Sequence, residues 1–359
     1  MQSTVALRKS YFGEKQRRFI LFGELTVDLF RYETGIEAIL MANKRGSLII
    51  LPFMGQMIWD ARFDGVELAM DSMFDLPRPS PGILGTYGCF LYHSGLLRNG
   101  CPSPEDDHPL HGEMPCAPVD EAWISFGEDD EGPWMTLHGR YEYVMGFGSH
   151  YDAIPSVTMR AGKTVFDVSM AVDNIGGSPM DLMYQCHVNY AFRKDGRIIQ
   201  PTGFTPDDVV VRTSVPGHVR PTEEYLSFMK ALAVDPALME TMRDPALYDP
   251  EFVFYVHNLK TDPSGRTHLM MQRPEGDGFY VSYNPEQLPH LVRWVLYNDD
   301  QKVCAFALPS TCEPEGYLAE KRKGNVRSLE PGKQAFFEVR LGYLKKGEAE
   351  TTARMIESL

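Results

Sequence analysis

The sequence predicts an all-β protein, a large β-sandwich with a small helical insertion. Short apolar or alternating runs recur along the chain, and glycine, proline, asparagine and aspartate separate them. Such a density of short strands with turn residues between them is typical of a sandwich. The chain has 359 residues, of which 43% are hydrophobic and 11% aromatic, so it can bury a large core. We expect a single domain over residues 1–359, because all-β domains can reach this length.

The clearest predicted strand covers residues 164–172. Every second residue from Phe166 to Val172 is large and apolar, as expected where one face of a strand is buried. Residues 174–179, Asn-Ile-Gly-Gly-Ser-Pro, then form a turn that leads into a further strand at residues 183–190. The other strands that we single out cover residues 47–52, 134–139, 252–256, 268–272 and 334–341.

One stretch departs from this strand pattern. Between residues 222 and 242, four large apolar side chains follow the spacing of a helix, namely Tyr225, Phe228, Met229 and Leu232. Asp-Pro pairs at residues 235–236 and 244–245 are turn signals. We therefore expect an inserted helix pair at residues 222–248, with its aromatic side chains used for packing.

The charge balance argues against two classes of partner. The chain has 35 Lys and Arg against 49 Asp and Glu, a net charge of -14, and no basic cluster that could neutralise phosphates. We therefore expect neither nucleic acid nor a membrane surface as a partner. The sequence shows no hydrophobic signal core and no run of ~18 apolar residues that could span a membrane. Its six cysteines form no Cys-x-x-Cys pair, so we expect reduced thiols in a cytoplasmic protein.

The strand predicted at residues 183–190 carries a row of polar side chains. Side chains alternate along a strand, so Gln185, His187 and Asn189 share one face. Histidine exchanges protons near neutral pH, so this row could form the wall of a site. It could equally be the solvated face of an antiparallel sheet. Cys186 points to the other face and is not expected to act as a nucleophile with His187.

A second set of polar residues lies in a long loop. Residues 77–118 are rich in proline and glycine, and loops of this kind can build binding sites. The loop contains Arg98 and three histidines, His93, His108 and His111. The three histidines could bind a metal ion, although His-x-x-His in a proline-rich loop is a weakly specific metal signal.

Other catalytic signatures are missing from the sequence. It contains no Gly-x-Ser-x-Gly motif and no Gly-x-x-x-x-Gly-Lys phosphate loop. Proton transfer fits the polar residues better, because a histidine could give or take a proton while Arg98 fixes a hydroxyl or carboxylate group. Trp294 could offer an apolar face to the C–H groups of a polyol ring, with burial in the core as the alternative.

Several short motifs occur in a characteristic order and spacing. Leu110-His111-Gly112 is followed by a strand with His187-x-Asn189-Tyr190. Near the C-terminus, Pro-Ser-Thr-Cys at residues 309–312 precedes Leu-Glu-Pro-Gly-Lys at residues 329–333. Together these motifs resemble the galactose mutarotase (aldose 1-epimerase) superfamily, in particular a poorly characterised bacterial branch, and the resemblance extends over residues 20–345.

This resemblance implies a β-supersandwich and the opening of a sugar or sugar acid ring without a cofactor or metal. In that mechanism a glutamate removes the proton of the anomeric hydroxyl, and a histidine protonates the ring oxygen. By position, His187 would be the acid, and His111 and Arg98 would bind the substrate. Asn189, on the same polar face as His187, would add a further contact.

The sequence departs from the family at the expected base. The family has a Glu-Pro pair near the C-terminus, whereas this chain has Leu308-Pro309, and leucine cannot accept a proton. Glu313 could replace the missing base if the chain is shifted by five residues. Glu113, next to Gly112, is another possible carboxylate.

Two further residues have both a functional and a structural interpretation. His257 falls at a predicted strand end where the family commonly has a polar substrate contact, or it is an ordinary surface residue. Arg293 precedes Trp294 on a predicted strand and could bind substrate, or it is a charge at the edge of a sheet.

The leading function is therefore interconversion of the anomers of a sugar or sugar acid. A non-catalytic carbohydrate-binding protein on the same fold is the first alternative, and Leu308 favours it. A metal-dependent sugar isomerase that uses His93, His108 and His111 is the second.

Overall fold

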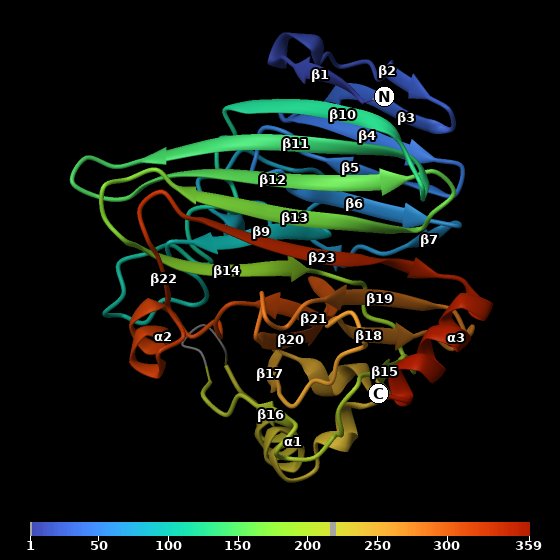
Figure 1. The fold of residues 1–359 in the computed structure, drawn as a ribbon. Helices are drawn as coiled ribbons and strands as arrows, with labels where there is room; N and C mark the ends of the chain where they lie inside the picture. The colour runs from blue at the N-terminus through green and yellow to red at the C-terminus, as the bar shows by residue number, and fades with distance from the viewer. Residues whose placement is uncertain (1, 216–219) are drawn as a thin grey trace.

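Two antiparallel β-sheets make up most of the protein (Figure 1), as the sequence predicts. The computed structural model describes residues 2–215 and 220–359. In spatial order, the nine-stranded sheet contains β1 (Ser3–Leu7), β10 (Glu121–Asp129), β11 (Gly132–Val144), β12 (His150–Arg160), β13 (Val165–Asn174), β23 (Gln334–Leu344), β19 (Gly278–Tyr283), β18 (Thr267–Gln272) and β15 (Arg197–Ile199).

The second sheet has 14 strands and places β14 near its middle. Its main path runs through β16 (Val209–Val211), β17 (Phe252–Val256), β20 (His290–Tyr297), β21 (Gln301–Ser310), β14 (Met180–Val188), β9 (Leu91–Leu96), β6 (Ile58–Phe63), β5 (Gly46–Ile50), β4 (Glu37–Asn43), β3 (Leu25–Arg31) and β2 (Arg17–Phe22). Three short strands pair outside this path: β22 (Arg327–Leu329) with β14, β7 (Val66–Glu67) with β6, and β8 (Asp71–Ser72) with β21. Strand β14 therefore joins strands from the N-terminal half to strands from the C-terminal half.

The alternation predicted for residues 164–172 is confirmed in β13. Every second residue from Phe166 to Asn174 is buried, and the residues between are half-buried. The predicted strands at 252–256, 268–272 and 334–341 correspond to β17, β18 and β23.

The predicted helical insertion is present, but it contains one α-helix rather than a helix pair. Helix α1 (Glu223–Val234) lies beside β16 (Figure 1), and Thr222 caps its first turn by accepting a hydrogen bond from the amide of Tyr225. Two short 3-10 turns follow, η3 (Pro236–Met239) and η4 (Pro245–Tyr248). Each begins with a proline after an aspartate whose side chain accepts an amide N–H two residues later, which favours a tight turn over a second helix.

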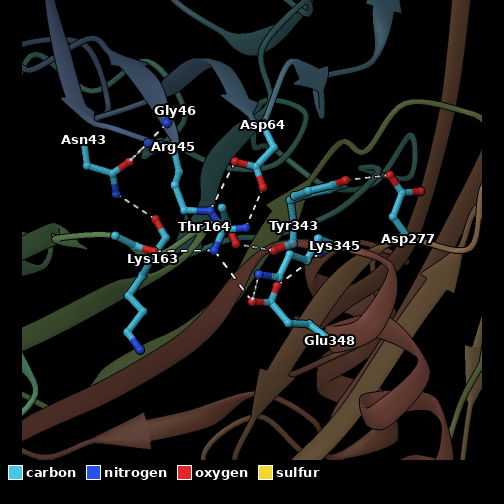
Figure 2. Close-up of polar contacts among 11 residues, drawn as sticks. Asn43, Arg45, Gly46, Asp64, Lys163, Thr164, Asp277, Tyr343, Lys345 and Glu348 are labelled. Carbon is cyan, nitrogen blue, oxygen red and sulfur yellow. Dashed lines mark hydrogen bonds and ion pairs between the residues drawn. The ribbon is translucent and has the colours of Figure 1, made fainter.

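Two helices near the C-terminus, α2 (Tyr317–Lys323) and α3 (Lys346–Glu357), were not predicted, and neither were two short 3-10 turns, η1 (Lys9–Tyr11) and η2 (Ile83–Gly85). Helix α3 packs its apolar face on β15, β18 and β23. Figure 2 shows how its first turn is tied to distant loops. Arg45, in the turn between β4 and β5, pairs with Asp64 and lies 3.7 Å from the carboxylate of Glu348 in α3.

The two faces of β14 have different surroundings, as the alternation of its side chains predicts. Tyr184 stacks on Phe337 of the nine-stranded sheet with ring centroids 4.9 Å apart. Tyr190, just after β14, donates a hydrogen bond of 2.9 Å to the carbonyl of Tyr280 in the same sheet. These side chains fill the core between the sheets, so Gln185 and His187 lie on the opposite face of the larger sheet.

No helix within the described part of the chain is long and apolar enough to cross a membrane.

Candidate functional site

His187 lies near the end of β14 and is held in one tautomer. Its Nδ1 is 2.8 Å from Oδ1 of Asn189. The Nδ2 of Asn189 donates a hydrogen bond of 3.0 Å to the carbonyl of Cys89, so Oδ1 is the amide atom that faces the imidazole. Because a carboxamide oxygen only accepts, Nδ1 of His187 carries the hydrogen, and Nε2 is the nitrogen that can exchange a proton.

Three aromatic rings surround His187. Tyr92, on the neighbouring strand β9, stacks on the imidazole with centroids 4.4 Å apart and planes 16° apart. Tyr87 and Trp294 pack edge-on against it, with centroids at 6.1 Å and 5.8 Å. The hydroxyl of Tyr87 lies 3.4 Å from Nε2 of His187 and 3.0 Å from the hydroxyl of Tyr92. The exchangeable nitrogen therefore faces a hydroxyl group inside an aromatic environment.

His111 joins this group from the long loop, as the sequence motif predicts. Its imidazole packs edge-on against His187 with centroids 5.1 Å apart. The backbone at His111 and Gly112 is left-handed, with φ of 61° and 78°. A Cβ at Gly112 would lie 2.0 Å from the carbonyl oxygen of Arg98, so only glycine fits this turn. We call His111, His187, Tyr87, Tyr92 and Trp294 the His187 cluster.

Burial sets the protonation state of the cluster. It lowers the pKa of His187 well below 6.5; the neighbouring His111 lowers it further, and the hydrogen bond to Asn189 opposes both. Burial also lowers the pKa of His111 to about 4, and the nearby charge of Glu251 opposes this shift. Both imidazoles are therefore neutral at pH 7. Burial raises the pKa of both tyrosine hydroxyls in the cluster, so they keep their protons.

Two polar groups near His187 have unused hydrogen-bonding capacity. Gln185 is fully buried on the same face of β14, and neither its amide oxygen nor its amide nitrogen has a partner among the described residues. The same holds for Nδ1 of His111. Unsatisfied buried polar atoms are rare in folded proteins, so they mark a place where a bound molecule or water could supply the missing contacts.

The remaining residues predicted to bind substrate lie elsewhere. The guanidinium of Arg98 stacks on the ring of Tyr317 at 3.6 Å and lies 3.7 Å from the carboxylate of Asp181. His257 is exposed just after β17, and its amide donates to the carbonyl of Asp208. Within the described residues, neither side chain contacts the His187 cluster. Their substrate-binding roles stay predictions.

Arg293 is fully buried and has a structural role. Its guanidinium binds the carbonyl of Phe306 at 2.9 Å, the amide oxygen of Gln200 at 2.7 Å and the sulfur of Met239 at 3.0 Å. It points to the face of β20 opposite Trp294, because successive strand residues alternate. Strand β20 lies between β17 and β21, so the alternative of a charge at a sheet edge is wrong. The role of Arg293 in substrate binding stays a prediction.

The region of the expected base contains Leu308 and Glu313. Gln185 of β14 pairs with Ser310 of β21, so Leu308, two residues earlier, lies on the same face as His187 and is buried. Glu313 lies beyond the end of β21, and its carboxylate pairs with Nζ of Lys323 at 2.6 Å. The role of Glu313 as the base stays a prediction.

The three loop histidines do not converge on a point where a metal could bind. His93 pairs with Cys186 across the sheet and hydrogen-bonds the hydroxyl of Tyr184 at 2.9 Å, so it faces the core. Both nitrogens of His108 are used by main-chain groups, the carbonyl of Pro109 and the amide of Tyr317. Only His111 of the three reaches the cluster, and no group of His, Cys, Asp and Glu among the described residues could hold a metal ion.

Sequence analysis missed four residues near His187, namely Tyr87, Tyr92, Arg212 and Glu251. Oε2 of Glu251 accepts a hydrogen bond of 2.7 Å from the indole N–H of Trp294, and Oε1 lies 3.0 Å from Arg212. Arg212 and Glu251 flank the helical insertion, where neither a motif nor a periodicity marks them. Tyr92 becomes visible only once the register of β9 against β14 is known.

Comparisons with known proteins agree with this architecture. Residues 219–342 match the model of the family described as Domain of unknown function (DUF4432), and no curated protein matches the sequence. A candidate aldose 1-epimerase from Klebsiella pneumoniae superposes with a TM-score of 0.80 at 15% identity, covering 99% of this chain and 95% of that one. The fold is that of the galactose mutarotase-like proteins. It is the β-supersandwich implied by the sequence resemblance.

Other galactose mutarotase-like structures are similar over most of their length. One from Clostridium acetobutylicum has a TM-score of 0.60 at 12% identity and covers 90% of this chain and 99% of that one. A candidate aldose 1-epimerase from Escherichia coli K12 has a TM-score of 0.53 at 14% identity, with coverage of 92% and 99%. At these identities the likeness concerns the fold, and the chemistry has to be argued from this chain's own residues.

Proposed function

We propose that the protein interconverts the anomers of an aldose by opening and closing its ring. The observation that carries this proposal is the placement of His187. Asn189 holds its Nδ1–H, so Nε2 alone is left to exchange a proton, and Nε2 faces a hydroxyl group within an aromatic cluster. The mutarotase-like fold supports the same class of reaction.

The reaction needs one proton to move at each of two oxygens. On opening, the proton leaves the anomeric hydroxyl, the C1–O5 bond breaks, and its electron pair goes to O5, which gains a proton. After rotation about the C1–C2 bond, the same transfers in reverse close the ring on the other face. Only the protonated imidazole carries a hydrogen on Nε2, so the reactive form is the one in which His187 has taken up a second proton. His187 donates that proton to O5 during opening and takes it back during closure.

The surroundings of His187 are suited to a sugar. Trp294 and Tyr92 supply aromatic faces for the C–H groups of a sugar ring. The amide of Gln185 and Nδ1 of His111 supply hydrogen-bonding groups that the described residues leave unpaired. The substrate is therefore a small-molecule sugar.

A neutral sugar fits these charges better than a sugar acid. Arg98, the cation expected to hold a carboxylate, is stacked on Tyr317. Arg212, which lies nearer to the cluster, already pairs with Glu251 and lies 3.7 Å from Glu315.

All six cysteines are free, which supports a cytoplasmic setting.

The test is anomer exchange measured by two-dimensional exchange NMR across a panel of neutral aldoses and uronic acids. We expect the protein to accelerate exchange of at least one neutral aldose, and His187→Ala to abolish that acceleration while the sugar still binds. Exchange at the buffer rate for every sugar that binds would contradict the proposal.

A non-catalytic sugar-binding protein is the second candidate, and Leu308 favours it. A buried leucine stands beside His187 where an acidic side chain would complete the proton transfer. The same NMR panel separates the two functions, because a binding protein would broaden or shift the sugar signals without exchange between anomers.

A further inference from the structure

One indole side chain contacts both His187 and a carboxylate. The ring of Trp294 packs edge-on against His187 at 5.8 Å and against Tyr87 at 5.6 Å, measured between centroids. Its Nε1–H donates a hydrogen bond of 2.7 Å to Oε2 of Glu251, the residue just before β17. A carboxylate at the start of β17 is therefore brought to the His187 cluster, although β17 does not adjoin β14 in the sheet.

Glu251 is fixed in this position from two further sides. Arg212, at the end of β16, donates to Oε1 at 3.0 Å, and both side chains are largely buried, with 8% of Arg212 and 15% of Glu251 exposed. Tyr225 of α1 donates from its hydroxyl to the main-chain carbonyl of Glu251 at 2.8 Å. Such preorganisation is expected of a group that acts on a bound molecule, because no side chain has to be ordered at the moment of reaction.

The charge of Glu251 reaches the atoms that surround Nε2 of His187. Burial is the main cause of the raised pKa of Tyr87, and the Glu251 carboxylate contributes to it. Glu251 also raises the pKa of His111 against the larger, opposite effect of burial. The hydroxyl of Tyr87 lies 3.4 Å from Nε2 of His187. The site of this hydroxyl is therefore close to the imidazole of His187 and is also affected by the charge of Glu251.

Two other carboxylates are engaged further from the cluster. Glu315 accepts a hydrogen bond from the hydroxyl of Tyr255 and lies 3.7 Å from Arg212. Glu313 is paired with Lys323 at 2.6 Å. Of the three, Glu251 is the one whose hydrogen-bond partner is itself a member of the cluster.

We propose that Glu251 is a catalytic residue, the carboxylate that exchanges a proton with the anomeric hydroxyl while His187 exchanges one with the ring oxygen. This proposal rests on the proposed function. On opening, an oxygen of Glu251 takes the proton from O1–H, and the O1–H electron pair forms the C1=O1 bond. The C1–O5 pair moves to O5, which takes the proton from Nε2 of His187. The reactive form is therefore the one in which Glu251 is ionised and His187 carries a proton on both ring nitrogens. Opening leaves Glu251 protonated and His187 neutral, and closure on the other face returns both protons.

The test compares three single variants by exchange NMR on a sugar that the wild-type protein interconverts. Glu251→Ala should lower the exchange rate at least ~100-fold, the usual contribution of a general acid–base group. Added formate should restore part of this rate, because a small carboxylate can enter the space left by the side chain. Glu315→Gln is the matched control, and we expect its rate to stay within about threefold of wild type, as for changes outside a site. Glu313→Ala tests the rival carboxylate.

The outcomes separate this proposal from the proposed function. Wild-type protein without exchange activity overturns both. An active wild type with Glu251→Ala within about threefold of it, or without formate rescue, overturns the role of Glu251 alone. A large loss in Glu313→Ala that formate restores, with Glu251→Ala active, would assign the base to Glu313. If Glu251→Ala does not fold, the rate of Glu251→Gln decides, because this variant keeps an acceptor for Trp294 but no carboxylate. A loss of at least ~100-fold supports the role of Glu251, and a rate within about threefold of wild type overturns it.

Discussion

Asn189 Oδ1 lies 2.8 Å from Nδ1 of His187, and this contact fixes which imidazole nitrogen is left without a hydrogen. The amide of Asn189 cannot turn over without losing its hydrogen bond to the carbonyl of Cys89. The tautomer of a buried histidine is thus set by a main-chain carbonyl just before β9. In the proposed reaction, position 189 would therefore act on the chemistry without touching the reacting atoms.

Replacing Asn189 should change the rate through the tautomer of His187. In Asn189→Leu, Nδ1 loses its acceptor, and we expect the exchange rate to fall about tenfold, as for the loss of one buried hydrogen bond. In Asn189→Asp, a carboxylate beside Nδ1–H should raise the pKa of His187. Both effects can be followed in the 15N chemical shifts of the imidazole during a pH titration. A tautomer that is unchanged in Asn189→Leu would show that another group fixes it.

The buried neutral histidine His111 should make the protein less stable in acid. Burial lowers its pKa to about 4, against 6.5 in the unfolded chain. As the pH falls from 6.5 to 4, the unfolded state binds the proton first, so the free energy of unfolding decreases. This contribution to the free energy of unfolding, about 3 kcal/mol, is fully present above pH 6.5. It is lost once the pH falls below 4.

Urea denaturation of wild type and His111→Gln at pH 7 and pH 4.5 measures this contribution. The loss of stability between the two pH values should be smaller in the variant by about 2–3 kcal/mol. His257→Gln is the matched control for the substitution itself, because it makes the same change at an exposed position. An equal loss in wild type and His111→Gln would mean that His111 is protonated in the folded protein.

The polar face of β14 could be predicted from the sequence because alternation is a local property of a strand. Gln185 and His187 required only that residues 183–190 be extended. The turn at Gly112 was not predicted, although a glycine there suits the left-handed backbone that the structure shows. The predicted part of the site follows from residues close together in the chain.

The partners of His187 could not be predicted, because they depend on strand register and on packing across the sheet. Tyr92 lies beside His187 only through the pairing of β9 with β14. Glu251 contacts the cluster by accepting a hydrogen bond from Trp294, whereas the guanidinium of Arg98 stacks on Tyr317 outside the cluster. The position of a charged residue in a motif thus does not fix where its charged group lies, because a long side chain can extend to a nearby aromatic or acidic group.

Glu113 should prove to be a structural carboxylate that holds the loop of His111. Its Oε1 accepts hydrogen bonds from the amides of Leu96 and Leu97, at 2.9 Å and 2.8 Å, and from the hydroxyl of Tyr151 at 2.7 Å. Glu113→Ala leaves these donors unpaired and should lower the free energy of unfolding by about 3 kcal/mol.

Urea denaturation checks this prediction, with Glu105→Ala as the control. Glu105 is an exposed acid of the same loop and should change the stability by less than about 0.5 kcal/mol. Glu113→Gln keeps an amide oxygen for the two main-chain donors, so its loss should be the smaller of the two Glu113 variants. A Glu113→Ala protein that is as stable as wild type but inactive would instead give this carboxylate a direct part in the reaction.

The hydroxyl of Tyr87 occupies the position at Nε2 of His187 that an oxygen of the sugar has to take. In Tyr87→Phe this competing group is removed while the ring still packs against Trp294. We therefore expect the KM for the sugar to fall about fivefold, the equivalent of one neutral hydrogen bond, with a smaller change in kcat. Tyr184→Phe is the control, because it removes a hydroxyl on the core face of β14 and should leave KM unchanged. A tenfold fall in kcat for Tyr87→Phe without a fall in KM would instead make the Tyr87 hydroxyl a participant in the proton transfer.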